Sequence, residues 1–467
     1  MTSAPAEPPA HLTAEGRPIR HGRELAARVP LGLHGWDAVQ LSLAAALFLM
    51  VWRFQSLFPS LAFYGLTFAA TPVALFVFWL DRDPRRRLSN LNQPVVRAAL
   101  GILVLVVLSI PTSLVPPRRS LEFLLAHLLT VALMLLVAAS VRGLVDLRRL
   151  VWLQVAGVTI FSAVVVARSP MGSEGRLLIT ASYADPNDLS LLIVSILPLT
   201  VYLWRPAGLL TRSLLAACAA FLMMTLGNTG SRGGFLGLLA VAAYLLLGFR
   251  GISRAKRVSA AALLAILLVV LASDRYFARM QTMLHPSTDY NWSGRSEDGR
   301  LEVWTRGIGY MLDHPVFGVG AGAFTTADGA LATQFAVRRQ HGGRFKSSAP
   351  HNSLLQIGAE IGVLGLILFV ALLIGAFRAL SRIRRGPAGE AAFLAQALIG
   401  SLVGFVVAAF FLSHAYSPFL YVLLGMSVGL AKIASPPRAP RLVARPPRPR
   451  LVSPPPPRMG SPGAFRN

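Results

Sequence analysis

Apolar residues follow one another in long blocks along this chain, and short polar segments separate the blocks. About twelve blocks approach the roughly 20 apolar residues that a helix needs to cross about 30 Å of hydrocarbon. They lie near residues 38–57, 60–80, 96–115, 120–140, 149–168, 189–204, 208–227, 233–249, 258–273, 353–377, 391–412 and 416–432. Because the bilayer offers no water to backbone groups, each block should form a helix. The pattern predicts an all-α polytopic membrane protein with about 12 transmembrane helices.

The composition agrees with this pattern. Hydrophobic residues make up 54% of the 467 residues and charged residues 14%, whereas about 25% of the residues in a soluble domain are charged. The polar ends, 1–35 and 433–467, are rich in proline and are predicted to be disordered tails. Between them we expect nine transmembrane helices in 36–273, a large loop in 274–351 and three more helices in 352–432.

The net charge of +25 would suggest a nucleic-acid partner in a soluble protein, but its distribution indicates a topology instead. If the N-terminus is cytoplasmic, every second loop faces the cytoplasm, and the basic residues gather in those loops. They follow the second, fourth, eighth and tenth predicted helices: Arg82, Arg85, Arg86, Arg87, Arg142, Arg148, Arg149, Arg250, Arg254, Lys256, Arg257, Arg378, Arg382, Arg384 and Arg385. This matches the positive-inside rule and predicts that both termini are cytoplasmic. The single cysteine, Cys218, excludes an intrachain disulfide and a cysteine-based metal site.

The segment 274–351 is predicted to lie outside the cytoplasm, and it is far longer than a connector requires. Its tryptophans and tyrosines favour an ordered loop with short interfacial helices. A stripe at helical spacing predicts a short amphipathic helix on the membrane surface; its members are Leu301, Trp304, Ile308 and Met311. Pro315 should end this helix, and the sequence GVGAGAF that follows should form a flexible turn.

Three further polar segments are predicted on the same side as this loop. GNTGSRGG (227–234) joins the seventh and eighth helices and carries Arg232, and YADPNDLS (183–190) leads into the sixth helix. APHNSLLQIGAEIGVLG (349–365) closes the loop and opens the tenth helix. In that helix three polar residues spaced four apart share one face: Asn352, Gln356 and Glu360. Polar groups from several segments are thus expected at one membrane surface.

Together these segments resemble the O-antigen ligase and polymerase family of bacterial envelope enzymes between about residues 180 and 370. The motifs that carry the resemblance are DPN (Asp185–Asn187), GSRGG around Arg232, GR…W with Arg300 and Trp304, HPVFGVGAGAF (314–324), and HNSLL…E.G..G from His351. The resemblance implies a membrane glycosyltransferase without a nucleotide sugar, metal or other cofactor. The donor would be a glycan on undecaprenyl diphosphate at the outer face of the inner membrane. The acceptor would be a lipid A core sugar in a ligase, or another lipid-linked repeat unit in a polymerase.

The resemblance also implies roles for individual residues. Arg232 and Arg300 match the family's essential arginines and are assigned to the diphosphate, with Arg295 as a further candidate. A guanidinium binds phosphate oxygens bidentately and stays charged. His351 matches the family's histidine, and an imidazole suits a general base that takes a proton from the acceptor hydroxyl. A single in-line displacement would invert the sugar carbon. Candidates for substrate contact or structural support are Asp185, Asn187, Asn352, Glu360 and Trp304.

Structural interpretations stand beside these roles. Arg232 could be a charge at a helix end, and His351 with Asn352 could cap the tenth helix, because Asn is a favoured N-cap residue. Glu360 could pair with an arginine to hold its helix in place, although an ionisable group within a transmembrane helix is functional by default.

Helix capping and packing explain other motifs equally well. Asp185, Pro186 and Asp188 are suited to be the N-cap, first and third residues of the sixth helix. A stripe of small residues in the tenth helix favours helix packing over chemistry; it consists of Gly358, Gly362 and Gly365.

Two other classes of function compete with the glycosyltransferase. A transporter or flippase of lipid-linked glycan would place ionisable residues near the membrane midplane and would be built from internal repeats. Here most charged residues lie in predicted loops, and the sequence has no fixed-period repeat. A sensing or scaffold protein would need no set of arginines and a histidine at one surface. Ligase and polymerase share the motifs, so the sequence leaves that choice open.

Overall fold

The computed structural model describes residues 35–52, 64–86, 88–172, 175–179, 185–287, 289, 291–294, 296, 298–331 and 347–434. Within these ranges the regular structure is helical, apart from one isolated bridge between Met171 and Leu177. The predicted all-α class is therefore confirmed. The two predicted disordered tails lie almost wholly outside the described residues, and so does Arg295.

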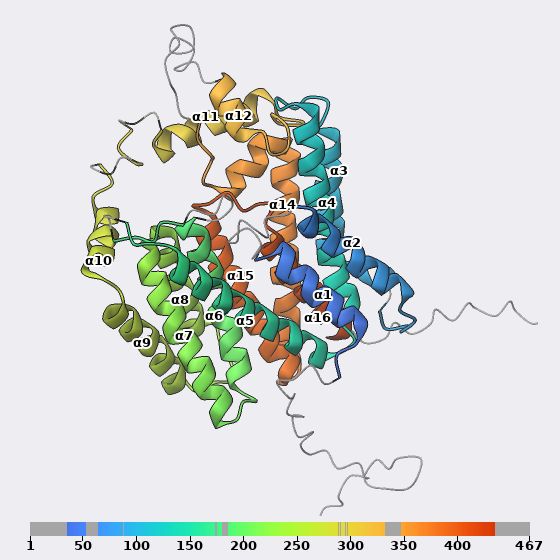
Figure 1. Cartoon of the computed structure of the whole chain (residues 1–467), viewed down its shortest axis with the longest axis vertical. Helices are drawn as coiled ribbons and strands as arrows, with labels where there is room; N and C mark the ends of the chain where they lie inside the picture. Colours follow the sequence, from blue (N-terminus) through green and yellow to red (C-terminus); the bar gives the residue numbers. More distant parts are fainter. Residues whose placement is uncertain are drawn as a thin grey trace, which may run out of the picture. The chain divides into compact units, whose positions relative to one another are not determined.

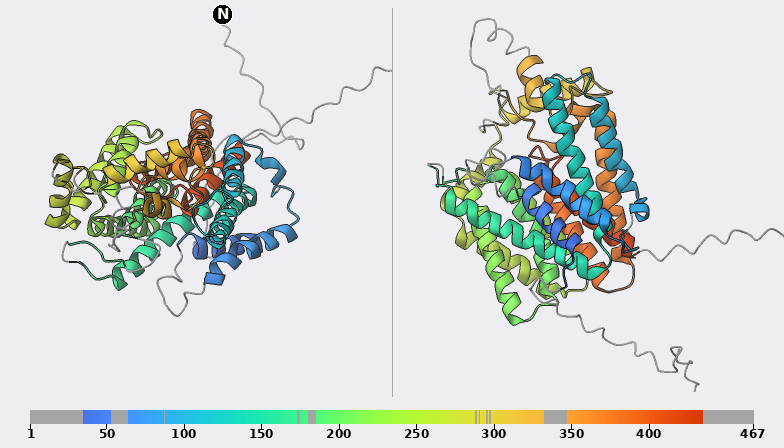
Figure 2. Two further views of the ribbon diagram at one scale, coloured as in Figure 1. Left: turned by 90° about the horizontal axis from the view of Figure 1, so that it is seen from above. Right: turned by 45° about the vertical axis from the view of Figure 1, so that its right-hand side comes forward.

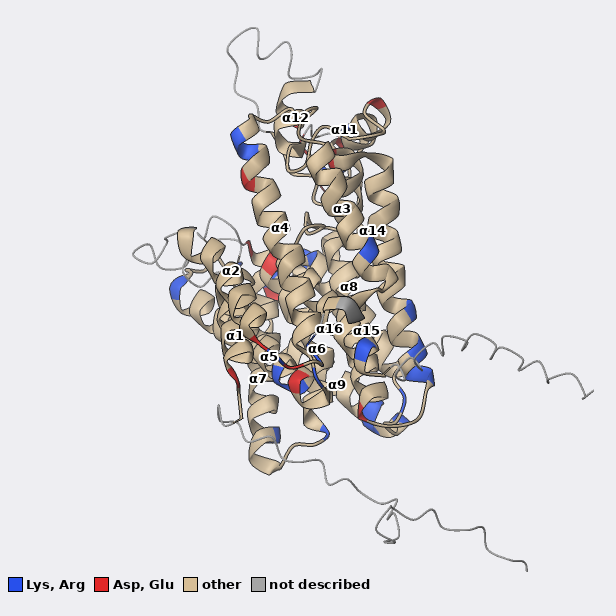
Figure 3. Ribbon diagram, turned by 90° about the vertical axis from the view of Figure 1, so that its right-hand side faces the viewer, with Lys and Arg blue, Asp and Glu red and all other residues tan. Residues whose placement is uncertain are grey.

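Each predicted apolar block coincides with one helix. The twelve helices are α1 (Ala38–Met50), α2 (Tyr64–Leu80), α3 (Pro94–Leu108), α4 (Pro117–Ser140), α5 (Leu144–Arg168), α6 (Pro186–Trp204), α7 (Leu209–Thr229), α8 (Arg232–Leu247), α9 (Arg254–Leu271), α14 (Ser353–Arg385), α15 (Glu390–Ala409) and α16 (Pro418–Ala434). Charged residues are sparse along these helices and gather toward their ends (Figure 3).

Six helices of the described chain are long and apolar enough to cross a membrane, namely α4, α5, α6, α7, α14 and α15. A seventh candidate arises if α9 and α10 (Asp274–Gln281), which meet at 110°, count as one bent span. Another five helices, α1, α2, α3, α8 and α16, are apolar but shorter. At 1.5 Å per residue the 17 residues of α16 extend about 25 Å, less than the roughly 30 Å of a bilayer core. The number of twelve spans therefore stays a prediction.

The helices pack around α6, α15 and α16, whose residues are mostly buried. α15 lies against α6 and α8, α16 against α4, and α14 against α3. α1 and α2 pack on each other and on α4 (Figure 2). At the other flank α7, α8 and α9 lie side by side (Figure 1). α9 buries only Leu268 and exposes apolar side chains such as Val270, as expected of a helix that faces lipid.

The segment 274–351 contains short helices, as predicted. They are α10, the 3-10 turn η4 (Thr282–Leu284), α11 (Arg300–Asp313) and α12 (Phe324–Leu331), and residues 332–346 lie outside the described part. α11 and α12 cover one end of α14 (Figure 1). The buried face of α11 consists of Val303, Gly307 and Tyr310. The predicted apolar stripe of α11, from Leu301 to Met311, lies beside this buried face. The buried face is the one that packs on α14 and α12.

α14 is interrupted at Ile361 and Gly362, where Gly362 has φ +80°. The segment that follows α11 takes up the hydrogen bonds that the helix gives up. Val319 N–H donates to Ala359 O at 2.9 Å, and Val363 N–H donates to Pro315 O at 2.9 Å. A Cβ at Gly362 would lie 2.5 Å from Pro315 O, so only glycine fits there. The GVGAGAF turn is thus wedged into a helix break, and Gly362 serves this break rather than ordinary helix packing.

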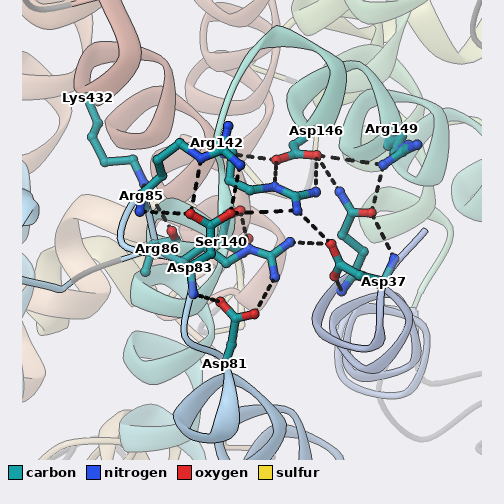
Figure 4. Close-up of polar contacts among 12 residues, drawn as sticks. Asp37, Asp81, Asp83, Arg85, Arg86, Ser140, Arg142, Asp146, Arg149 and Lys432 are labelled. Atoms are coloured by element: carbon teal, nitrogen blue, oxygen red, sulfur yellow. Dashed lines mark hydrogen bonds and ion pairs between the residues drawn. The ribbon is translucent and has the colours of Figure 1, made fainter. Parts of the chain in front are cut away.

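A network of ion pairs joins the start of α1, the segment that follows α2, and residues 142–149 at the start of α5 (Figure 4). We call it the paired cluster; its members are Asp37, Asp81, Asp83, Arg85, Arg86, Arg142, Asp146 and Arg149. Arg86, with a side chain 2% exposed, bonds Asp37 at 2.6 Å and Asp81 at 3.2 Å. Several of the basic residues predicted to mark the cytoplasmic side therefore also tie helices together.

Candidate active site

Five segments that are far apart in the sequence meet near the start of α14. They are the start of α6, the α7–α8 turn, the described residues of 289–304, residues 347–353 and the α15–α16 loop. An aromatic cluster joins the long loop to the end of α15. The ring of Trp304 lies 5.2 Å from that of Trp292 and 5.6 Å from that of Phe410. Trp292 also lies 6.5 Å from Phe411. The long loop therefore lies directly over the end of α15.

The DPN motif forms the start of α6. Asp185 is the N-cap and accepts the N–H groups of Asn187 at 2.6 Å and Asp188 at 3.0 Å. Asp188 accepts the Asp185 N–H in return at 2.9 Å, which completes a capping box. The side chain of Asn187 donates to Asp185 at 3.2 Å. The capping interpretation of Asp185, Pro186 and Asp188 is confirmed.

The GSRGG motif forms the α7–α8 turn. Ser231 caps α8 by accepting the Gly234 N–H at 3.1 Å. A Cβ at Gly234 would lie 2.5 Å from Ser190 Cβ of α6, so the glycine is needed for this close approach. Arg232, 17% exposed, is the first residue of α8; it pairs with Asp289 and donates to Thr282 Oγ1 at 3.2 Å.

Arg232 changes the pKa of Asp289. Burial alone would raise the pKa of the Asp289 carboxyl, but the hydrogen bond from Arg232 prevails and holds the pKa below its usual value. Arg232 is therefore more than a charge at a helix end, because it connects α8 to the long loop. Asp289 was not marked by any motif.

Two further arginines lie at the same turn, and the sequence analysis missed both. Arg176 Nε donates to Thr229 O at 3.0 Å. A Cβ at Gly230, which has φ +60°, would lie 3.4 Å from Arg279 Cδ and 3.8 Å from Arg176 Cγ. Nothing in the sequence around Arg176 or Arg279 distinguishes them from other basic residues, since only the fold brings them to this turn.

The GR…W motif lies at the start of α11. Arg300 is the first residue of α11, after the N-cap Gly299. Trp304 Nε1 donates to Pro350 O at 2.8 Å. Trp304 thereby holds the segment that leads into His351, which is a supporting role.

The same segment is held from a second side. Asp328, which is fully buried, accepts two hydrogen bonds from Arg306, at 2.7 and 3.1 Å, and the Ser348 N–H at 2.9 Å. Tyr310 lies beside this pair, and burial raises its pKa to about 12. Residues 347–350 are therefore fixed to α11 and α12 on both sides of the approach to His351.

His351 and Asn352 have different structural roles. Asn352 caps α14 by accepting the N–H groups of Leu354 at 2.9 Å and Leu355 at 3.0 Å. His351 precedes the cap and has φ +44°, a strained conformation for a residue other than glycine. Its N–H donates to Ser413 Oγ at 3.0 Å. The cap belongs to Asn352, and the strain at His351 is unexplained by helix capping.

His414 was missed by the sequence analysis. Its Nε2 lies 2.7 Å from Asp188 Oδ1, although 226 residues separate the two in the chain. Asp188 also interacts electrostatically with His351. Two imidazoles therefore lie around one carboxylate at the start of α6.

Glu360 lies directly before the break in α14. It is 3% exposed and accepts the N–H groups of Gly322 at 3.0 Å and Phe324 at 3.4 Å. The side chains of Gln356 and Tyr416 also interact with it. The alternative of an arginine partner does not hold, because the partners of Glu360 are these two side chains and the backbone N–H groups of the wedged turn and of α12. Glu360 therefore connects the turn and the α15–α16 loop to α14.

An apolar groove of about 180 Å³ opens between α11 and α14, next to these residues. Its lining consists of Trp304, Ile308, Met311, Asn352, Leu354, Leu355 and Leu366. In the described part of the chain, no group of three or more His, Cys, Asp or Glu residues could hold a metal ion.

The apolar helices and this site define a multi-pass membrane protein. Its residues 214–370 match the O-antigen ligase family (Wzy_C), and the family resemblance inferred from the motifs is thereby confirmed. The matched range includes Arg232, Arg300, Trp304, His351 and Glu360, whereas Asp188 and His414 lie outside it. No curated protein matches the chain.

Proposed function

We propose that this protein transfers a glycan from an undecaprenyl-diphosphate carrier to a hydroxyl of an acceptor glycan. The observation that carries this proposal is that Gly233, next to Arg232, and the backbone of His351 adjoin one short segment, 411–413. A Cβ at Gly233 would lie 3.3 Å from Phe411 Cβ, and His351 N–H donates to Ser413 Oγ at 3.0 Å. This proximity supports a single site with a cation for the leaving diphosphate and a base for the acceptor.

The arginines suit a diphosphate. Arg232 and Arg300 are both the first residues of helices, α8 and α11, where the helix dipole disfavours a cation by about 0.3–1 kcal/mol. The same helix ends favour an anion, because their N–H groups point outward. An anionic ligand would turn this unfavourable placement into a favourable one. Arg176 and Arg279 add positive charge beside Arg232.

His351 suits the acceptor step. In the proposed reaction it takes the proton of the acceptor hydroxyl while the hydroxyl oxygen forms a bond to the anomeric carbon of the donor glycan. The bond from that carbon to the diphosphate breaks, and the undecaprenyl diphosphate leaves with the electron pair. One displacement inverts the anomeric carbon and needs neither a metal nor a covalent enzyme intermediate. The strained backbone at His351 is typical of functional positions.

The apolar groove between α11 and α14 would hold part of the isoprenoid chain of the donor. Its lining is apolar except for Asn352, and it lies next to Trp304 and to the start of α14. Each Å² of apolar surface that the carrier buries would contribute about 25 cal/mol to binding, which favours the carrier over a water-soluble diphosphate.

The positions of the basic residues support a periplasmic site with both termini in the cytoplasm. This topology includes the shorter helices α1, α2, α3, α8 and α16 as transmembrane segments and places 274–351 outside. A reporter active only outside the cytoplasm should be active when fused near residue 340 and inactive near residues 255 and 385. The opposite pattern would contradict the site assignment, because every proposed residue would face the cytoplasm.

The direct test is transfer by purified protein in detergent, with an undecaprenyl-diphosphate-linked glycan and two alternative acceptors. A product on lipid A core would identify a ligase, and a doubled lipid-linked repeat unit would identify a polymerase. Mass spectrometry distinguishes the two products. Absence of product from either acceptor with a protein that binds the donor would contradict the proposal.

A transporter of lipid-linked glycan is the second candidate, and the interruption of α14 favours it, because transporters use broken helices at their binding sites. The same experiment separates the two candidates. Detergent solution has no compartments, so a transporter has no product there, whereas a transferase forms a new glycosidic bond.

A further inference from the structure

The loop between α15 and α16 is docked onto the start of α14 by a set of hydrogen bonds in both directions. His351 N–H donates to Ser413 Oγ at 3.0 Å, and His414 N–H donates to Ser353 Oγ at 2.9 Å. Ser353 Oγ in turn lies 2.7 Å from Leu412 O. These bonds hold His414 in a fixed position relative to His351, although the two residues lie far apart in the chain.

This docking brings His414 to Asp188 at the start of α6. The capping box fixes one oxygen of Asp188, since Oδ2 accepts the Asp185 N–H at 2.9 Å. The other oxygen, Oδ1, lies 2.7 Å from His414 Nε2. Both oxygens are thus oriented, and helix capping by itself would have needed only the first.

We propose that Asp188, held by His414, is a positioning residue that stabilises the protonated imidazole of His351 during transfer. The proposal rests on the proposed function. A carboxylate beside a catalytic imidazole stabilises the imidazolium that forms when the imidazole takes a proton. Asp188 interacts electrostatically with both His351 and His414. The proton that His351 takes from the acceptor hydroxyl stays on the imidazole until it passes to solvent.

The charged and titratable groups around this unit come from several elements. Asp188 is faced by His414 from the α15–α16 loop, by His351 from the start of α14, and by Asp185 from its own helix. On α8 and the long loop, Arg232 pairs with Asp289. Asp188 is the carboxylate that interacts with both histidines.

The test is the pH–rate profile of transfer by the full-length protein with saturating donor and acceptor. Asp188→Asn keeps the size of the side chain and an oxygen for the Asp185 N–H, but it removes the negative charge. We expect kcat to fall about 10-fold or more and the acid limb of the profile to move to lower pH, because the imidazole holds its proton less strongly. KM for the donor should change little, since the arginines remain.

His414 provides a second, graded variant. His414→Gln can still donate a hydrogen bond to Asp188, whereas His414→Ala cannot. We expect His414→Gln to retain several-fold more activity than His414→Ala, with thermal stabilities measured in parallel. Asp313→Asn, which neutralises an exposed carboxylate at the end of α11, is the matched control and should keep the wild-type profile.

The outcomes separate the two proposals. If wild-type protein fails to transfer at any pH, the proposed function is wrong. If wild-type protein transfers and Asp188→Asn retains its kcat and its acid limb, the inference about Asp188 is wrong. A loss of activity that only follows the loss of folded protein, with the acid limb in place, would also overturn it and reduce Asp188 to a helix cap.

Discussion

The paired cluster and the candidate active site are both rich in arginine, but their charges are arranged differently. In the paired cluster, four arginines face four aspartates, and the connections run through Asp37, Arg86 and Arg142 (Figure 4). At the candidate active site, Arg176, Arg232 and Arg279 lie at the α7–α8 turn, and Arg300 lies at the start of α11. Two carboxylates of the described residues take part there: Asp289 pairs with Arg232, and Asp188 pairs with His414.

This difference indicates different purposes. Opposite charges in equal number stabilise the contacts between helix ends and leave no net attraction for a ligand. Arginines gathered at one turn attract an anion, and a guanidinium can bind phosphate oxygens bidentately. Substitutions in the two regions should therefore differ in whether they reduce turnover or stability.

Removal of Arg232 should abolish transfer while the protein remains folded. Arg232→Ala should lose at least about 100-fold in turnover, and Arg232→Lys should remain impaired, because a point charge does not replace a bidentate fork. Arg142→Ala, in the paired cluster, is the matched control: it should lower thermal stability and keep the turnover per folded molecule. Equal turnover of the two alanine variants would end the distinction between the regions.

Replacement of His351 should separate chemistry from stability. His351→Asn loses the imidazole but tolerates the positive φ well. We expect a loss of about 10²–10⁴-fold in turnover, with a melting temperature equal to or above that of the wild type and nearly unchanged donor binding. Full turnover at saturating acceptor would rule out His351 as the general base.

Removal of Arg86 should affect stability alone. Breaking a buried ion pair costs about 3–5 kcal/mol, but Asp37 and Asp81 are 34% and 22% exposed, so we expect about 2 kcal/mol for Arg86→Ala. Arg85→Ala is the control, because Arg85 is 67% exposed and an exposed ion pair contributes little to stability. Thermal unfolding in detergent measures both, and a transfer defect of folded Arg86→Ala would contradict the proposed purpose of the cluster.

The smallest expected effect is the pH dependence of stability that the pair of Asp83 with Arg85 causes. Hydrogen bonds from Arg85 lower the pKa of Asp83 to about 2, whereas an unfolded aspartate titrates near 3.9. Because the folded value is depressed, the stabilisation is present above about pH 4 and is lost as the pH falls toward 2. The difference in melting temperature between wild type and Asp83→Asn should be largest near neutral pH and should vanish near pH 2. A difference that is constant with pH would exclude this ion pair as its source.

The sequence by itself determined the helices and their caps. Apolar blocks become helices because the backbone in a bilayer has no other partner, and this holds for each block separately. Asp185 and Asn352 were recognisable as caps because capping depends on residues within three positions along the chain. The ordered motifs around Arg232, Arg300 and His351 were sufficient to indicate the family.

Only the tertiary structure decided which distant groups meet. The pairing of Asp188 with His414, the approach of Arg176 and Arg279 to the α7–α8 turn, and the wedge of 315–324 in the break of α14 have no local signal. They depend on how helices cross, and a hydrophobic pattern specifies that a face is buried without specifying its partner. Glu360 illustrates the limit: its depth in the helix marked it as important, but only the fold revealed that it accepts two backbone N–H groups of the wedged turn and of α12.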